Sequence, residues 1–221
     1  MKEEDKEQRL AKHELPTDVL NGIKTVVFDL DGTLYDKRGL AKRMARRLWW
    51  CLPLLAAERL ARRNMHYLNC ASEEEFFDAF FRQMARGHWW TASIAATWYH
   101  TVYMPTMVSL IRFYHHPRPE VLALVRLAKE AGLQVAIYSD YGSVTEKLDA
   151  LGIDATQFDL MIAAPQLGAL KPSEYCAREV LELLQAQPQT TLFVGDRDDK
   201  DGASARSVGA HFLLIKTDNG K

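Results

Sequence analysis

The stretch that decides the fold, residues 26–36, reads Val26-Val27-Phe28-Asp29-Leu30-Asp31-Gly32-Thr33-Leu34-Tyr35-Asp36. Its apolar, β-branched beginning is typical of a strand buried on both faces of a parallel sheet. Asp29 and Asp31 follow two residues apart, so their side chains point the same way from the carboxyl end of that strand. Open α/β sheets bind their ligands at this end.

Two neighbouring carboxylates at a buried sheet end need a positive partner. Like charges raise each other's pKa, and packing alone gives no use for such a pair. A hard metal ion with oxygen ligands is the simplest partner for Asp29 and Asp31. This stretch alone leaves open a second interpretation, in which the strand runs out into an acidic surface turn.

Length and composition bound the class of protein. The 221 residues suit one large domain or a core with a smaller insert, and 26% charged with 48% hydrophobic residues is typical of a globular chain. A net charge of −1 gives the chain no overall positive potential that would attract nucleic acid. The three cysteines are far apart and form no CxxC pair, and the charged residues 1–9 contain no apolar segment. These features predict a cytoplasmic protein without disulfides, zinc or a signal peptide.

The chain divides into three parts by its patterns. Residues 1–22 are expected to be a charged N-terminal arm, residues 36–116 a helical insert, and residues 23–35 with 117–221 an α/β core. In the core, strands alternate with helices, which predicts a Rossmann-like parallel sheet covered by helices on both faces. The expected strands are Lys24–Leu30, Val135–Tyr138, Leu160–Ala163, Leu192–Val194 and Phe212–Ile215.

The insert shows helical periodicity and no convincing strand. Ser72 and Glu75 form a capping box that opens one helix. The residues 92–112 predict one or two more helices with a break near Pro105. We therefore expect an all-helical insert of about four helices.

Polar residues follow each of four predicted strands. Asp29 and Asp31 follow the first, Ser139 ends the second, Lys171 lies in the loop after the third, and Asp196 follows the fourth. Parallel strands all point the same way, so these groups should converge at one sheet edge. Taken singly, Ser139 would be an ordinary turn residue and Lys171 a solvated loop lysine, but together they make up a site.

Four segments resemble, in order, the motifs of the haloacid dehalogenase-like (HAD) hydrolase superfamily: Asp29-Leu30-Asp31-Gly32-Thr33, Tyr138-Ser139-Asp140, Leu170-Lys171-Pro172, and Gly195-Asp196-Arg197-Asp198-Asp199-Lys200-Asp201. The resemblance covers residues 24–35 and 117–216. The insert falls between the first and second motifs, where this superfamily has its helical C1 cap. Residues 141–170 are too few for a second cap.

The resemblance implies a role for each motif residue. Asp29 would be the nucleophile that forms an aspartyl-phosphate, and Asp31 the general acid and base. Ser139 would donate a hydrogen bond to the phosphoryl oxygens. Lys171 would neutralise the charge of Asp29 and of the phosphate.

The resemblance also implies Mg²⁺ as the cofactor. Its ligands would be Asp29, the main-chain carbonyl of Asp31, and Asp196. Asp199 and Asp201 are both candidates to support the water ligands of the metal from a second shell, and the sequence leaves the choice open.

An acid at position 31 favours a phosphatase or a phosphomutase within this superfamily. We expect a phosphatase for a small phosphorylated metabolite, with no clear nucleic-acid or membrane partner. One alternative is a phosphomutase with the same active site. Another is a catalytically idle binding protein that uses the basic surface of the cap.

That basic surface begins on the first helix of the insert. Lys42, Arg43 and Arg46 lie opposite an apolar stripe, and Trp49 and Trp50 fall among them on a helical wheel. A solvated face whose arginine stems cover aromatic surface is the commoner outcome for such a pattern. The alternatives are an anion-binding cap face, or a surface that contacts membrane or nucleic acid.

Overall fold

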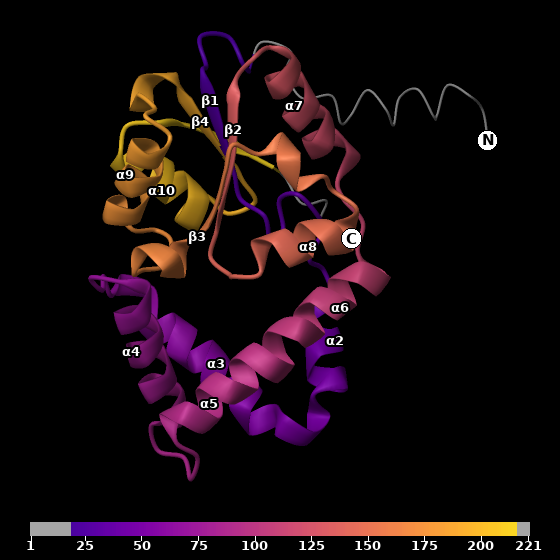
Figure 1. The fold of residues 1–221 in the computed structure, drawn as a ribbon, viewed down its shortest axis with the longest axis vertical. Coiled ribbons are helices and arrows are strands. Elements are labelled where there is room, and N and C mark those ends of the chain that lie inside the picture. Colours follow the sequence, from indigo (N-terminus) through magenta and orange to yellow (C-terminus); the bar gives the residue numbers. More distant parts are fainter. Residues whose placement is uncertain (1–18, 216–221) are drawn as a thin grey trace, which may run out of the picture.

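The computed structural model describes residues 19–215, and its centre is one parallel sheet (Figure 1). The five strands follow the order β3-β2-β1-β4-β5, so the direction of strand addition reverses beside β1. Ligands bind at such a reversal in open α/β sheets. The strands are β1 (Thr25–Phe28), β2 (Gln134–Ser139), β3 (Leu160–Ala163), β4 (Thr191–Gly195) and β5 (His211–Leu214).

Helices cover both faces of the sheet because the strand residues are apolar on both sides. Val26 and Phe28 belong to one buried cluster, with side chains of α7 and α8. Val27 points the other way, into a second cluster with side chains of α9 and α10. The helices are α7 (Pro119–Glu130), α8 (Val144–Leu151), α9 (Glu174–Leu183) and α10 (Ala203–Ser207). The predicted fold class is thereby confirmed.

A helical cap lies beyond the carboxyl edge of the sheet (Figure 1). Between β1 and α7 the structure has five α-helices rather than about four: α2 (Leu40–Arg47), α3 (Leu52–Asn64), α4 (Glu73–Ala85), α5 (Ala92–Trp98) and α6 (Met104–Tyr114). The expected break near Pro105 is a π-helical segment, Tyr99–Tyr103, that joins α5 to α6. Pro105 is tolerated because it lies in the first turn of α6.

Short helical turns connect these elements. The 3₁₀ turns are Trp49–Cys51, Met65–Tyr67, Ala155–Gln157, Ala164–Leu167 and Pro188–Thr190, and a second π-helical segment is Asp198–Gly202. At the start of α4, Ser72 Oγ accepts a hydrogen bond from the Glu75 amide (3.2 Å), as the capping box predicts. The Glu75 carboxylate accepts from the Ala71 amide (2.7 Å), one residue before the expected partner.

Element ends differ from the sequence expectation by one or two residues. The first strand ends at Phe28 rather than Leu30, and the last covers His211–Leu214 rather than Phe212–Ile215. Of the N-terminal arm expected over residues 1–22, residues 1–18 lie outside the described part, as do residues 216–221 of the core. No helix within residues 19–215 is long and apolar enough to cross a membrane.

Two hydrogen bonds to core carbonyls help to dock the cap on the core. The Cys70 amide donates to the Gly168 carbonyl (2.9 Å). Gly168 has a φ of +83°, and a Cβ at this position would collide with the Cys70 carbonyl. The Arg62 guanidinium of α3 donates to the Asp140 carbonyl (3.1 Å). Residues of α3 and of the segment before α4 therefore hold the cap against the core.

Candidate active site

The strand register brings the predicted site residues together. Phe28 of β1 is aligned with Ile137 of β2 and Val194 of β4, so three neighbouring strands end at one level. Asp29 follows directly, and its amide donates to the Val194 carbonyl (2.8 Å). Ser139 is the last residue of β2 and is fully buried.

Asp29 lies at the centre of a buried hydrogen-bond network. One carboxylate oxygen accepts from Lys171 Nζ (2.8 Å) and the other from Thr33 Oγ1 (2.9 Å). Burial alone would raise the pKa of Asp29. The Lys171 ammonium and the two hydrogen bonds have a larger, opposite effect, so the pKa lies below its ordinary value of 3.8. The carboxylate is therefore ionised at neutral pH, which a nucleophile requires.

Lys171 bridges two carboxylates. Its Nζ also donates to Asp201 Oδ1 (2.8 Å). Burial lowers the pKa of Lys171, but the Asp29 and Asp201 charges outweigh this and raise it above its ordinary value. Burial raises the pKa of Asp201 to about 6, although Lys171 opposes the shift. Lys171 is thus a permanent cation beside Asp29.

Asp31 accepts three side-chain hydrogen bonds. Oδ1 accepts from the Tyr35 hydroxyl (2.6 Å), and Oδ2 accepts from Lys147 Nζ (2.7 Å) and Ser139 Oγ (3.1 Å). Burial, followed by the Asp31 charge, raises the pKa of Tyr35 well above its ordinary value, so this phenol remains a donor. The side chain of Asp31 is therefore held in one orientation beside Asp29.

Lys147 is a site residue that the motifs do not identify. Its side chain is 0% exposed and pairs with Asp31. Burial lowers the pKa of Lys147, and the Asp31 carboxylate only partly offsets this effect. A signal was present in the sequence: on α8, Lys147 shares the apolar stripe of Val144, Leu148 and Leu151. A lysine in a buried stripe requires a buried counter-ion.

Replacing Lys147 with Met should lower kcat about 100-fold with little change in KM, because Asp31 would lose one of its three hydrogen-bond donors and its compensating charge. Steady-state phosphate release would measure both constants. Lys129→Met is a matched control, since Lys129 forms an exposed ion pair with Asp159 on the core. A loss of kcat no greater than that of the control would contradict a role for Lys147 in orienting Asp31.

A cation-binding position lies between the first and fourth motifs. Lys37 Nζ approaches the Asp31 carbonyl oxygen to 2.7 Å and Asp196 Oδ2 to 2.9 Å. Gly32, with a φ of +110°, leaves the required space: a Cβ there would collide with the Asp196 carboxylate and approach Lys37 Nζ to 2.6 Å. Thus an ammonium group occupies a cradle of oxygens.

These oxygens fit a divalent ion as well as an ammonium group. Oxygen atoms of Asp29, Asp196 and Asp201 lie within 4.8 Å of one another. Carboxylate and carbonyl oxygens are the ligands that Mg²⁺ prefers. Asp201 therefore belongs to the cluster, whereas the Asp199 side chain is 66% exposed and pairs with Arg197. Of the two second-shell candidates, the structure brings only Asp201 to the site.

The site opens into a cavity of about 660 Å³ between cap and core. Arg59, Arg63 and His66 line it from the cap, and Arg197 and Lys200 line it from the core. The cavity also contains the carboxylates of the first and fourth motifs. An anionic ligand entering this cavity would meet cations on both sides.

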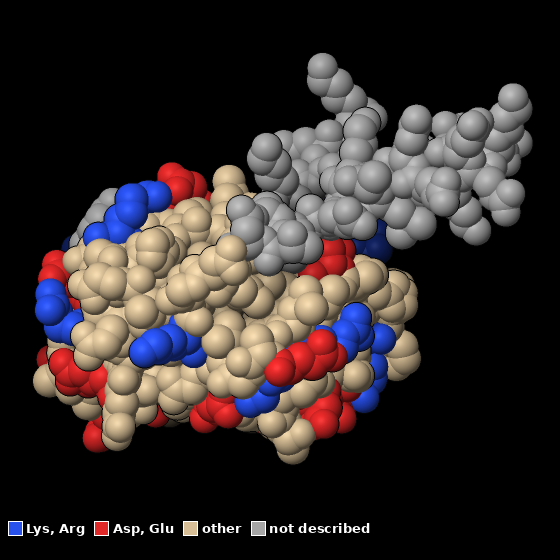
Figure 2. All heavy atoms as spheres, turned by 90° about the horizontal axis from the view of Figure 1, so that it is seen from above, with Lys and Arg blue, Asp and Glu red and all other residues tan. Residues whose placement is uncertain are grey.

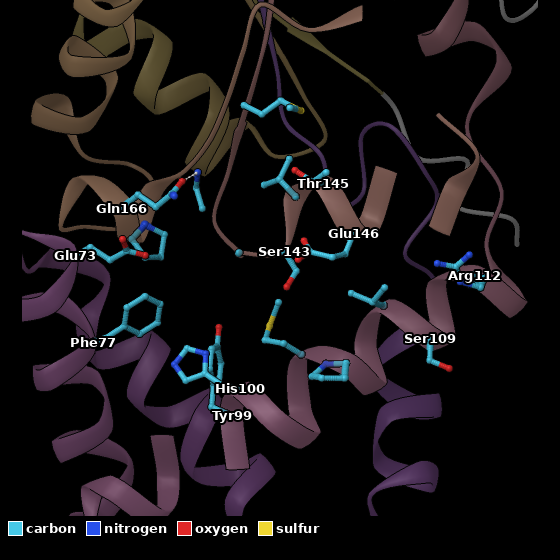
Figure 3. Close-up of a pocket in the computed structure, with 18 of the residues that line it drawn as sticks. Glu73, Phe77, Tyr99, His100, Ser109, Arg112, Ser143, Thr145, Glu146 and Gln166 are labelled. Atoms are coloured by element: carbon cyan, nitrogen blue, oxygen red, sulfur yellow. Dashed lines mark hydrogen bonds between the residues drawn. The ribbon is translucent and has the colours of Figure 1, made fainter. Parts of the chain in front are cut away.

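A second cavity, of about 800 Å³, also lies between cap and core (Figure 3). Phe77, Tyr99 and His100 line it from the cap, and Ser143 and Gln166 from the core. None of the motif residues Asp29, Asp31, Ser139, Lys171 or Asp196 is among the lining residues.

A hydrogen-bonded pair joins a residue that lines the second cavity to one that lines the first. The Tyr99 hydroxyl accepts from Arg62 (3.2 Å), and Arg62 lines the first cavity. The Arg62 guanidinium also lies 3.8 Å from the Tyr141 ring centroid and pairs with Glu58 (2.8 Å). Arg62 is thus fixed in the lining of the motif-lined cavity by Tyr99, Tyr141 and Glu58.

A model of the haloacid dehalogenase-like hydrolase family matches residues 23–209. The match covers more than half of the chain, and the chain therefore belongs to this family. The predicted family and the hydrolase class are confirmed. The motif residues and their arrangement at one sheet edge agree with this membership.

Curated relatives match the chain over different lengths. A phosphoglycolate phosphatase of Aquifex aeolicus is 26% identical over 187 residues, which are 84% of this chain and 81% of the relative. A glyceraldehyde 3-phosphate phosphatase of Methanothermobacter thermautotrophicus is 25% identical over 212 residues, with coverages of 89% and 87%. A haloacid dehalogenase-like hydrolase domain-containing protein 3 of Bos taurus is 30% identical over 94 residues, which are 42% of this chain and only 37% of that protein.

Solved structures share the fold. A mutant of CbbY from Rhodobacter sphaeroides, in complex with xylulose-(1,5)bisphosphate, has a TM-score of 0.62 at 19% identity, covering 88% of this chain and 87% of that one. A HAD phosphatase from Thermococcus onnurineus has a TM-score of 0.60 at 19% identity, with coverages of 90% and 89%. At these identities the likeness concerns the fold alone.

Proposed function

We propose that the protein is a Mg²⁺-dependent phosphatase that hydrolyses a small phosphomonoester through an aspartyl-phosphate on Asp29. The observation that carries the proposal is the ionised Asp29 carboxylate, fixed by Lys171 and Thr33 at the floor of a cation-lined cavity. The phosphatase names of the two long-matching relatives support it.

The residues of the site divide the reaction between them. An Asp29 oxygen attacks phosphorus, the bond to the leaving oxygen breaks, and Asp31 supplies the proton that this oxygen needs. Asp31 then takes a proton from the water that attacks the phosphorus of the aspartyl-phosphate, and the bond between phosphorus and the Asp29 oxygen breaks, which releases inorganic phosphate and restores the carboxylate. Ser139 and Lys171 lie beside the two carboxylates and can donate hydrogen bonds to phosphoryl oxygens.

Asp29, the Asp31 carbonyl and Asp196 would hold Mg²⁺, which supplies positive charge that brings the anionic phosphate to the anionic nucleophile. Lys37 would leave the oxygen cradle when the metal is bound, because its Nζ lies among the same atoms. Asp201 would help to hold Lys171 in place beside Asp29, since its carboxylate pairs with Lys171 Nζ.

The cavity favours a substrate with a second negatively charged group. The side chains of Arg59 and Arg63 are exposed in the cavity, and the structure gives neither a carboxylate partner within residues 19–215. Both lie on the cap, opposite the nucleophile, so they are positioned to pair with an anion at the other end of a short molecule. Phosphoglycolate, the compound in the name of one relative, carries such a group.

A screen for phosphate release tests this function. We expect turnover of a small phosphorylated acid or sugar bisphosphate in the presence of Mg²⁺, complete loss with a chelator, and recovery when Mg²⁺ is added back. Asp196→Asn should raise the Mg²⁺ concentration for half-maximal activity about tenfold or more, because one charged ligand is lost. Asp199→Asn, whose side chain points into solvent, is the control and should leave this concentration unchanged.

The alternatives give different results in the same screen. A phosphomutase would yield a phosphorylated isomer instead of inorganic phosphate, since the phosphoryl group would return to a substrate hydroxyl. A binding protein without catalysis would release no phosphate from any substrate. Turnover that is insensitive to chelation would contradict the role of Mg²⁺.

A further inference from the structure

We infer that the end of the cap farthest from the sheet is a docking surface for anionic lipid bilayers. We call it the distal cap surface, and we define it by exposed residues of the last turn of α2, the α2–α3 connection, the first residue of α3 and the α4–α5 connection: Arg46, Arg47, Trp49, Trp50, Leu52, Arg86 and Trp89. The inference does not depend on the proposed phosphatase activity.

Large apolar side chains gather on this surface without protein neighbours to bury them. The exposed fraction is 71% for Trp49, 59% for Trp50, 48% for Leu52 and 87% for Trp89. The other two tryptophans of the chain, Trp90 and Trp98, are buried. Scattered exposed apolar residues are ordinary, but three exposed tryptophans in two connections at one end of a domain indicate an interaction site.

The exposure follows from the local sequence. On α2, the apolar stripe of Leu40 and Met44 continues into Leu48, and all three are buried in the cap. The chain then turns through Trp49–Cys51, and only Cys51 of this turn is buried. Leu40, Met44 and Leu48 already occupy the buried face of this segment, so Trp49 and Trp50 lie outside the core.

The distal cap surface is basic as well as aromatic. Residues 36–116 contain twelve Lys and Arg against six Asp and Glu, although the whole chain has a net charge of −1. No acidic residue occurs in 37–57 or in 79–119, the ranges that contain the two connections. Most of the acids of this segment lie in the first half of α4, which begins beside the core.

The arrangement in space suits a flat partner. In Figure 1, the α2–α3 connection and the α4–α5 connection both lie at the lower end of the cap, away from the sheet. A planar bilayer can contact two projecting connections at once. The opposite end of the molecule differs: Figure 2 shows acidic and basic side chains interspersed there.

Charge and side-chain type favour a bilayer over other partners. Tryptophan enters the headgroup region of a membrane, and neighbouring Lys and Arg bind anionic lipids. Leu52 has no stacking face for a nucleic-acid base, whereas it can enter the acyl boundary. A second copy that presented the same surface would bring like charges together. We therefore assign the surface to an anionic bilayer.

Co-sedimentation of the full chain with lipid vesicles tests the assignment. We expect binding to vesicles of phosphatidylglycerol and phosphatidylcholine, little binding to phosphatidylcholine alone, and loss of binding between about 0.1 M and about 1 M salt, where the screening length falls from about 10 to about 3 Å. Combined Trp49→Ser, Trp50→Ser and Trp89→Ser should reduce the partition coefficient about tenfold or more.

Charge reversal and a control separate the contributions. Arg46→Glu with Arg47→Glu should reduce binding to the anionic vesicles by a similar factor. The matched control, Arg126→Glu with Leu127→Ser, changes an exposed basic and apolar pair on α7 of the core and should leave binding unchanged. Circular dichroism and the thermal midpoint of each variant verify that it is folded.

Several outcomes would overturn the assignment. One is the absence of wild-type binding to anionic vesicles at low salt, and another is binding that the tryptophan substitutions leave intact. Preferential capture of a single-stranded oligonucleotide in competition with the vesicles would assign the surface to nucleic acid. A dimer in light scattering that the tryptophan substitutions dissociate would assign it to a second copy.

Discussion

Asp29→Asn should reduce phosphate release by a factor of about 10⁴ or more, because an amide cannot form the covalent intermediate. The other catalytic groups act on that intermediate, so they cannot replace the missing nucleophile. Initial rates with saturating Mg²⁺ and substrate would measure the loss. The substitution should also prevent the acid-stable labelling of the protein that an aspartyl-phosphate would leave after a rapid quench.

The fold should survive the loss of this charge. In the Asp29→Asn variant, Lys171 would keep its contact with Asp201, so no buried cation would be left unpaired. We expect a thermal midpoint near that of the wild type. Asp36→Asn provides a control at an acid of the same stretch that pairs with Arg38 outside the catalytic cluster. Turnover that persists in Asp29→Asn would exclude this residue as the nucleophile.

Lys171→Met should lower both activity and stability. The substitution leaves Asp29 and Asp201 buried side by side without their shared cation. Removal of one member of a buried charged group typically costs about 3–5 kcal/mol in the free energy of unfolding. Chemical denaturation without added metal would measure this loss, and phosphate release should fall about 1000-fold or more because charge repulsion between Asp29 and the phosphate is no longer offset.

The stability loss in Lys171→Met should depend on pH in a defined direction. In the wild type, the pKa of Asp29 is below 3.8, so its contribution to stability is present above pH 3.8 and is lost as the pH falls through the folded-state pKa. Without Lys171, burial would raise the pKa of both carboxylates above the unfolded value, and stability would be lost as the pH rises. The difference between variant and wild type should therefore be largest at neutral pH and shrink toward pH 4. A constant difference across this range would contradict the proposed ion pairing.

Much of the site is predictable from sequence because parallel strands align their ends. The i, i+2 spacing of Asp29 and Asp31 after an apolar run, and the polar residues after β2 and β4, are local patterns with one geometric outcome. The periodicity of the strands and helices in the core gave their order and type. Only their ends were displaced, since the last residues of an element depend on tertiary contacts.

The residues that support the site are harder to predict because tertiary packing, and not a local sequence motif, brings their side chains to it. Lys37 is an ordinary lysine in sequence, and the apolar stripe around Lys147 indicates that it is buried but not which acid it pairs with. The packing of α8 and of the loop after β1 brings the two lysines to Asp31 and Asp196. In the same way, the spacing of the last motif does not indicate which of Asp199 and Asp201 lies near the metal site. The π-helical segment at residues 198–202 separates them, burying Asp201 and exposing Asp199.

The placement of Lys37 bears on the order in which the protein is assembled. Asp29, Asp196 and Asp201 each have a cationic partner within the chain itself, Lys171 for Asp29 and Asp201 and Lys37 for Asp196. The polypeptide can therefore reach its native state before any metal is bound, unlike small zinc domains, in which metal binding and folding are a single event. Under the proposed function, arrival and departure of Mg²⁺ would exchange one cation for another within a folded protein, and a cell short of magnesium would hold an idle enzyme rather than an unfolded chain.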